Sequence, residues 1–126
     1  MPTPSIVNAT AVGKEVIRRN YFDGVAEAGV IVLQGLANHT MTTVSIIISE
    51  RSNLSDSLFN MIFHPDAGTG MYLLTNEPIP NQSTFIFNDK VAITGTDRIF
   101  IECSSASDAA TLDVWVTYID QQFAAP

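Results

Sequence analysis

The stretch TDRIFIECSSASDAATLDVWVTYI, residues 96–119, is the part of the sequence that most clearly indicates a fold. Apolar residues alternate with other side chains over 98–104 and again over 111–118, which is the period of a β-strand whose two faces differ. Residues 104–110 between them are small and polar, and they are too many for a two-residue turn. The pattern therefore predicts two strands joined by an open loop, and we interpret them as a hairpin that closes an antiparallel sandwich.

The length and composition favour one domain made of sheet. The chain has 126 residues, of which 46% are hydrophobic and only 15% are charged. This length is sufficient to bury a core, and the many Val, Ile and Thr residues favour strands over helices. Residues 1–12, which include two prolines, predict an extended N-terminal arm, and residues 13–126 predict the sandwich domain. So few charges on a domain in water suggest that a partner covers part of its surface.

The charge and the cysteine count exclude several kinds of partner. The formal net charge is −7, so a nucleic acid is not an expected partner. No run of residues has the length and apolarity of a membrane span, and residues 1–10, MPTPSIVNAT, have neither the basic start nor the apolar stretch of a secretory leader, so we expect no membrane association. The single cysteine, Cys103, excludes an intrachain disulfide and is expected to be a small buried apolar residue.

Turn signals divide the chain into about eight short strands. Residues 14–22 predict an edge strand that ends in a turn at Asp23 and Gly24, and the apolar run 30–33 predicts a buried strand. Residues 36–42 are expected to form a turn and residues 50–57 an exposed loop. The prolines within 76–81 predict a crossover between sheets or an edge strand. This order predicts an all-β protein, a single antiparallel β-sandwich of the jelly-roll or Greek-key type. Further predicted strands are 44–49, 58–63, 71–75, 84–88 and 91–93.

The residue types that carry catalysis or bind metals do not form a recognisable motif. His39 and His64 each fall in a predicted loop, and neither has the spacing of further ligands that a zinc site needs. A calcium site between loops is an alternative for some of the aspartates, but without the Asp-x-Asp-x-Asp-Gly pattern we expect their charges to keep the surface soluble. We therefore expect no catalytic residues, no cofactor and no bound metal, and we expect that the protein is not an enzyme. The aspartates considered are Asp56, Asp66, Asp108, Asp113 and Asp120.

Two aromatic residues give the only sign of assembly in the strand pattern. Trp115 lies between Val114 and Val116, so it points to the opposite face of its strand. In a hairpin of the expected register it would lie beside Phe100. Because one face of a sandwich strand belongs to the core, this aromatic pair on the other face would be covered by a partner. The alternative is that a flanking loop of the same chain buries it.

The second half of the chain has a characteristic succession of short segments. They are the Pro78-Ile79-Pro80 crossover, residues 83–87, Val91-Ala92-Ile93, Gly95-Thr96-Asp97-Arg98-Ile99, and residues 106–112 followed by Asp113-Val114-Trp115-Val116-Thr117-Tyr118-Ile119. This succession resembles the small β-sandwich virion proteins of tailed bacteriophages. The resemblance is structural, covers about half of the chain, and implies a non-enzymatic component of the particle. The sequence departs from the usual pattern by having Thr96 between Gly95 and Asp97 and by the bulky Trp115.

Within that class we expect a capsid decoration or cement protein, located in the virion after synthesis in the host cytoplasm. It would bind the major capsid protein or other virion proteins and associate with itself, first of all as a trimer. The expected contact residues are Trp115, Phe100 and the arm residues Pro2, Pro4 and Ile6, because an extended segment can add to another sheet. A neck, collar, tail or fibre-attachment component is one alternative. A lectin-like module is another, with Trp115, Tyr72 or Tyr118 stacking on sugar.

Overall fold

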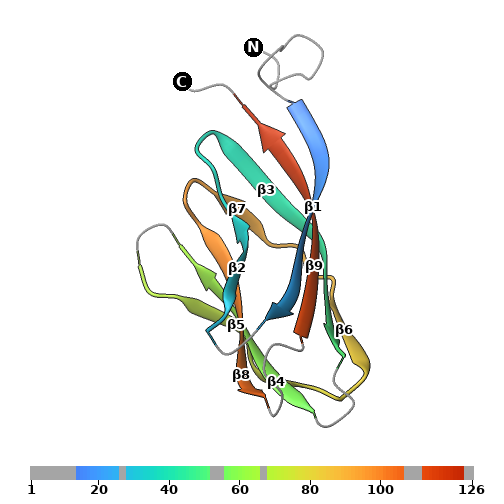
Figure 1. Cartoon of the computed structure of the whole chain (residues 1–126). Helices are drawn as coiled ribbons and strands as arrows, with labels where there is room; N and C mark the ends of the chain where they lie inside the picture. The colour runs from blue at the N-terminus through green and yellow to red at the C-terminus, as the bar shows by residue number, and fades with distance from the viewer. Residues whose placement is uncertain (1–13, 26–27, 52–55, 66–67, 107–111, 124–126) are drawn as a thin grey trace.

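The computed structural model describes residues 14–25, 28–51, 56–65, 68–106 and 112–123, and within these ranges every regular element is a β-strand. The predicted all-β sandwich is confirmed: two antiparallel sheets pack face to face (Figure 1). No helix in the described residues is long and apolar enough to cross a membrane. The strands are β1 (Lys14–Val25), β2 (Val30–Gln34), β3 (His39–Glu50), β4 (Ser57–His64), β5 (Met71–Ile79), β6 (Ser83–Phe87), β7 (Ala92–Thr94), β8 (Arg98–Ala106) and β9 (Leu112–Gln122).

The strand order is that of a jelly roll. One sheet, which we call sheet A, has the order β1-β9-β3-β6, with β7 also paired to β3; the other, sheet B, has the order β2-β8-β4-β5. The first strand pairs with the last, β2 with β8, β3 with β6 and β4 with β5, as if one long hairpin had been rolled up. The pairs β3–β9 and β4–β8 then join these units into two sheets.

This topology shows that the hairpin predicted for residues 96–119 is wrong. β8 and β9 both have the alternating burial that the sequence indicates, but β8 belongs to sheet B and β9 to sheet A. In a jelly roll, consecutive strands lie mostly in opposite sheets, so their apolar faces meet across the core instead of side by side. Alternation alone cannot distinguish these two arrangements, because it is the same in both. Part of the predicted loop, residues 107–111, lies outside the described residues.

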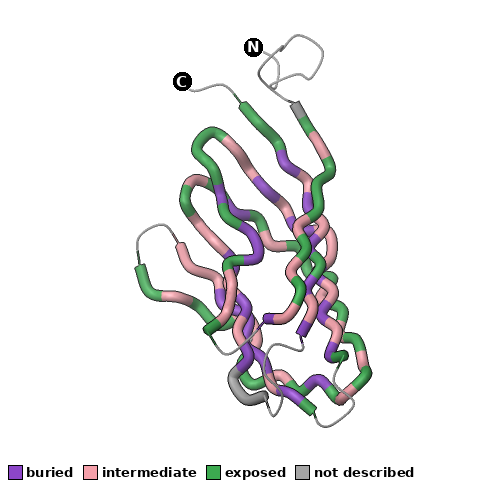
Figure 2. Tube along the Cα trace, in the orientation of Figure 1, coloured by how far each residue is buried: buried purple, intermediate pink, exposed green. Residues whose placement is uncertain are grey.

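The core lies between the two sheets and consists of the inward-facing members of the alternating strands. Buried residues recur at every second position along β8 and β9 (Figure 2). Removing this apolar surface from water is the main force that holds the sheets together. Cys103 is buried here as predicted, and its Sγ lies 3.4 Å from the carbonyl oxygen of Val25. Other fully buried core side chains include Val32, Leu33, Ile46, Ile48, Phe59, Met61, Ile93, Ile99 and Ile101.

Several strand boundaries differ from the predictions because strands pair across turn-like sequences. β1 continues through Asp23 and Gly24 as a bulge, with the register shifting between Phe22 and Val25, and Gly24 takes a positive φ of 79°. β3 already begins at His39, inside the predicted turn 36–42, and its neighbours there are β7 and β9. β5 runs through Pro78 to Ile79 at the edge of sheet B, which confirms the edge position expected from the prolines.

The expected exposed loop 50–57 is wrong at both of its ends. Glu50 ends β3 and Ser57 begins β4, and both residues are almost completely buried. The Ser57 hydroxyl donates a hydrogen bond to the Glu50 carboxylate, which provides a polar partner that a buried carboxylate needs. Residues 52–55 lie outside the described residues.

Candidate binding face

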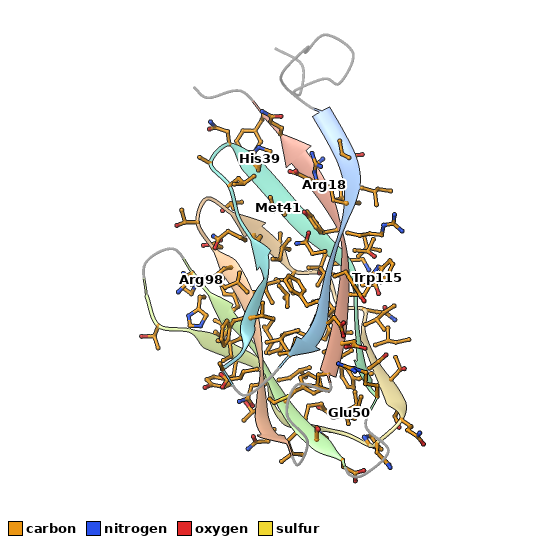
Figure 3. All side chains as sticks on the ribbon, viewed as in Figure 1. Arg18, His39, Met41, Glu50, Arg98 and Trp115 are labelled. Atoms are coloured by element: carbon orange, nitrogen blue, oxygen red, sulfur yellow. The ribbon has the colours of Figure 1, made fainter. Side chains whose placement is uncertain are left out.

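The outer face of sheet A carries a continuous row of large apolar side chains, one from each of its four main strands. Tyr21 of β1 lies opposite Trp115 of β9, Trp115 opposite Ile47 of β3, and Ile47 opposite Ile86 of β6. We call these four residues the open row. Tyr21 is 63% exposed, Ile86 55% and Trp115 40%. Figure 3 shows Trp115 on the side of β9 that faces away from sheet B.

Two neighbours on β1 fix the position of the Trp115 ring. The ring of Tyr21 meets it edge to face, with 5.9 Å between the ring centroids and 66° between the ring planes. The guanidinium carbon of Arg19 lies 5.5 Å from the centroid of the indole, which is a cation–π distance. The indole is thus held by side chains of its own sheet, while two fifths of its surface stays in contact with water.

A hollow of about 190 Å³ opens beside the open row, lined by Tyr21, Ile47, Trp115, Ser49, Asp113 and Val114. Its polar rim is ordered by hydrogen bonds. The Gly24 amide donates to Oδ1 of Asp113 over 3.0 Å, and Nε of Arg51 donates to the same oxygen over 3.3 Å. In the same cross-strand row as Asp113, the Ser49 and Thr84 hydroxyl groups are 3.1 Å apart and share a hydrogen bond. The arrangement combines an aromatic wall with a fixed carboxylate and hydroxyl groups.

The outer face of sheet B carries an equivalent row, but the protein itself covers its middle. Ile31, Phe100, Ile62 and Tyr72 lie opposite one another across β2, β8, β4 and β5, and we call them the closed row. Ile62 is only 4% exposed although it points away from the core. The backbone of Gly29 approaches the Phe100 ring so closely that an added Cβ would lie 2.4 Å from its Cζ.

His64 completes the cover over the closed row. Its imidazole meets the Phe100 ring edge to face with centroids 6.1 Å apart, and His64 lies at the end of β4 instead of in the predicted loop. The expected pair of Trp115 and Phe100 is therefore wrong, because the two residues belong to different sheets and lie on opposite outer faces. Each has its own neighbours, and a loop of the chain covers only Phe100.

A polar cluster lies at the end of sheet A where β1 begins and β9 ends (Figure 3). Asp120 is only 5% exposed, and its carboxylate accepts a hydrogen bond from Nε of Arg18 over 3.0 Å. Its other oxygen is 2.6 Å from Nδ1 of His39. Burial raises the pKa of the nearby Tyr118, with Arg18 acting in the opposite direction. The expectation that Asp120 only makes the surface soluble is wrong, and His39 lies on strand β3 instead of in a loop.

The remaining predicted site residues do not gather into a site. Asp56 accepts a hydrogen bond from the amide of Asn81, and Asp66 and Asp108 lie outside the described residues. Among the residues that the structure describes, no three His, Cys, Asp or Glu side chains are placed to hold a metal ion together. Pro2, Pro4 and Ile6 also lie outside the described residues. Tyr118 is buried, so it is not available to stack on a sugar, whereas Tyr72 is exposed at the end of the closed row.

The sequence interpretation identified Trp115 but missed the residues that surround it. Tyr21, Ile47 and Ile86 come from three other strands, and only the register of sheet A brings them into one row. The sequence did contain one indication of this row. Ile47 is an apolar residue between Ile46 and Ile48, at a position where the alternation of a strand would place a polar residue. Such a residue on the outer face of a strand is expected to be covered or to bind something.

Comparison with known proteins gives a likeness in fold and none in sequence. No protein-family model matches the chain, and no curated protein matches it either. A chain in the acidic stable capsid structure of Helicobacter pylori bacteriophage KHP30 superimposes with a TM-score of 0.51 at 9% identity, over 90% of this chain and 92% of that one. This shows that the two chains share a fold over nearly their whole lengths.

A second likeness is weaker and covers part of a longer chain. A chain in the crystal structure of the T13 IBDV viral particle superimposes with a TM-score of 0.47 at 7% identity, over 98% of this chain and 41% of that one. The present chain thus spans less than half the length of this second protein.

Proposed function

We propose that the protein is a non-enzymatic structural component of a bacteriophage particle, a decoration or cement protein that binds and stabilises the major capsid shell. The observation that carries this proposal is the jelly-roll fold, which matches a chain of a phage capsid structure over nearly the full length of both chains. Jelly rolls are common in viral shells, although they also occur in lectins and other proteins. The resemblance of residues 71–119 to small phage virion proteins supports the same class.

The free edge of β1 is the surface that we assign to the shell. In the described part of sheet A, β1 pairs only with β9, so the other side of its 12 residues has unpaired backbone groups. An extended segment of another protein could add to such an edge as a further strand. The proposed arm, residues 1–12 with Pro2, Pro4 and Ile6, directly precedes this strand and would reach the same neighbour.

The charges of β1 complement an acidic partner. β1 carries Lys14, Arg18 and Arg19, three of the six basic residues of the chain, and the acidic residues Glu15 and Asp23, so its formal charge is +1 in a chain with a net charge of −7. A second β1 would bring a like net charge to the edge, whereas an acidic segment would bring the opposite one. The edge therefore favours a different, acidic segment over a second β1.

We propose that the protein acts as a homo-oligomer, with a trimer as the first expectation. The two apolar rows lie on opposite outer faces of the sandwich, so contact between the open row of one copy and the closed row of the next would propagate as an open stack, and contact between two like rows would close as a dimer. A closed ring of three subunits must therefore use the edges of the sheets. Sedimentation velocity of the purified protein tests this: a single species of three subunits supports the ring, and a monomer alone contradicts it.

Co-sedimentation with capsid shells that lack the protein tests the shell-binding proposal. We expect saturable binding, and deletion of residues 1–12 should weaken it at least tenfold while circular dichroism shows an unchanged fold. Arg19→Glu should also weaken binding, whereas Lys90→Glu, the same charge reversal far from β1, should not. Binding that survives both the deletion and Arg19→Glu would contradict the proposed surface, and no binding to shells would favour a neck, collar, tail or fibre-attachment component.

A further inference from the structure

The hollow beside Trp115 has features of a small-ligand site that shell binding does not require. Its walls are the rings of Tyr21 and Trp115 together with Ile47 and Val114, and its volume is about 190 Å³. Pockets for drug-sized molecules usually measure at least roughly 300 Å³. A hollow of this size suits a molecule smaller than a drug, such as a single small ring.

The Asp113 carboxylate is held in place through one oxygen, and its second oxygen can accept hydrogen bonds from a ligand. Both of its hydrogen bonds within the described residues, from the Gly24 amide and from Arg51, go to Oδ1. Oδ2 accepts none there, and the side chain is 30% exposed at the edge of the hollow. A carboxylate held through one oxygen presents the other at low entropic cost, and its hydrogen bonds to neutral donors are stronger than those between neutral groups.

The charges around the hollow are balanced, which argues against a charged ligand. Arg51 lies 3.3 Å from both Asp23 and Asp113, and Arg19 lies over Trp115. Among the described residues, two carboxylates thus face two guanidinium groups within the same corner of the sheet. A cationic ligand would meet both arginines and an anionic ligand both aspartates, so a neutral ligand avoids repulsion from either.

The pattern of the face also argues against a protein interface at this point. Polar rows flank the open row on both sides: Arg19, Thr117 and Ser45 lie opposite one another on one side, and Asp113, Ser49 and Thr84 on the other. The core of a protein interface is depleted of charges. The open row is a narrow apolar stripe between hydroxyl and carboxylate groups. Such a stripe suits a ligand that has an apolar C–H face and also carries hydroxyl groups.

We infer that this hollow binds a saccharide, with the apolar face of one neutral sugar ring against Trp115 and with sugar hydroxyl groups donating to Oδ2 of Asp113. The Ser49 and Thr84 hydroxyl groups at the rim would bind further hydroxyls. Trp115 is the only tryptophan of the chain, so its fluorescence reports on this site alone. This inference does not depend on binding to a shell, and it assigns the open row to a ligand while the β1 edge contacts the capsid.

Titration of the whole protein with a panel of neutral hexoses, N-acetylhexosamines and short oligosaccharides tests the inference. We expect at least one of them to change the Trp115 emission saturably, and to shift the indole N–H resonance in NMR spectra. Asp113→Asn, which keeps the size of the side chain and an oxygen for the Gly24 amide, should weaken that binding at least tenfold. Tyr72→Ala on the opposite outer face should leave it unchanged.

Two results would overturn the saccharide site. The first is a panel in which no sugar at concentrations up to about 100 mM, a range that covers very weak binding, perturbs Trp115. The second is sugar binding that is as strong in Asp113→Asn and Trp115→Ala, followed by calorimetry, as in the original protein. Burial of Trp115 on addition of capsid shells, seen as a blue shift of its emission, would instead assign the open row to a protein partner.

Discussion

The outer faces of the two sheets have the same construction, but the chain covers the centre of one and leaves the centre of the other exposed to solvent. Each carries one large apolar residue from every main strand, Tyr21 to Ile86 on sheet A and Ile31 to Tyr72 on sheet B. On sheet B the chain covers the centre of its own row with Gly29 and His64, and Ile62 is almost completely buried. On sheet A the centre of the row, Trp115, remains accessible.

This difference separates apolar residues that stabilise the fold from those that are available for binding. The ring of Phe100 has neighbours above and beside it, so its burial contributes to the free energy of folding. Trp115 has Tyr21 at its edge and Arg19 over its ring, but 40% of the residue stays exposed, and this exposed part contributes little to folding until something covers it. A protein with few charges and an uncovered aromatic row is expected to bind a partner or ligand there.

The largest expected effect comes from truncating the central aromatic residue of each row. Phe100→Ala should lower the free energy of unfolding by about 3 kcal/mol, because it removes a ring packed between Gly29, His64 and the β-sheet. Trp115→Ala should cost less, about 1–2 kcal/mol, because 40% of this residue is already exposed to water. Urea unfolding measures both, and an equal or larger loss for Trp115→Ala would remove the distinction between the rows.

A smaller effect is expected from filling the space that Gly29 leaves for Phe100. Gly29→Ala places a methyl group against the Phe100 ring at a positive φ of 79°. Gly95→Ala is the matched control, since Gly95 also has a positive φ, of 56°, but no atom lies near its added Cβ. The control should lose about 1 kcal/mol from backbone strain, and Gly29→Ala about 1 kcal/mol more from overpacking.

The outcome for these two glycine variants can be read from their thermal midpoints and from urea unfolding. If both variants lose the same stability, the chain does not cover the closed row tightly, and sheet B would have an open face as well. Sugar binding at Trp115 should be unaffected in either folded variant, because the two rows lie on opposite faces.

The smallest expected effect concerns Tyr118, a buried residue on the inner face of sheet A, which can be compared with the rows on the two outer faces. Burial raises the pKa of Tyr118 above its ordinary value of 10.0. As the pH rises, Tyr118 therefore loses its hydroxyl proton at a lower pH in the unfolded chain than in the folded chain. The contribution of Tyr118 to the free energy of unfolding is complete below about pH 10 and is lost as the pH rises through the pKa of the folded state. Urea unfolding between pH 8 and 11 should show a steeper decline for the original protein than for Tyr118→Phe. Equal slopes would contradict the burial of this tyrosine.

Much of the fold could be predicted from the sequence because burial in a sandwich has a period of two. The alternation in β8 and β9, the edge position of β1, the buried Cys103 and the sandwich class all follow from local pattern. The expected count of about eight strands is close to the nine observed. These features depend on neighbours within one segment, which the sequence shows directly.

The partners of each strand could not be predicted in the same way. Placing Trp115 beside Phe100 required knowing that β8 and β9 pair, and the jelly-roll order instead pairs β9 with β1 and β3. The Asp120 cluster joins residues 81 and 102 positions apart in the chain. The buried Glu50 depends on a hydrogen bond to Ser57 across a hydrophilic segment. Register and tertiary partners decide these features, and alternation is the same for many registers.

Cryo-electron microscopy of capsid shells incubated with the purified protein tests the central claim most directly, namely that this jelly roll decorates a phage shell by its β1 edge and keeps the open row outward. We expect density repeated over the capsid lattice, with β1 toward the shell and Trp115 facing solvent. Shells without added density, or density placed only at a unique vertex, would contradict the decoration role.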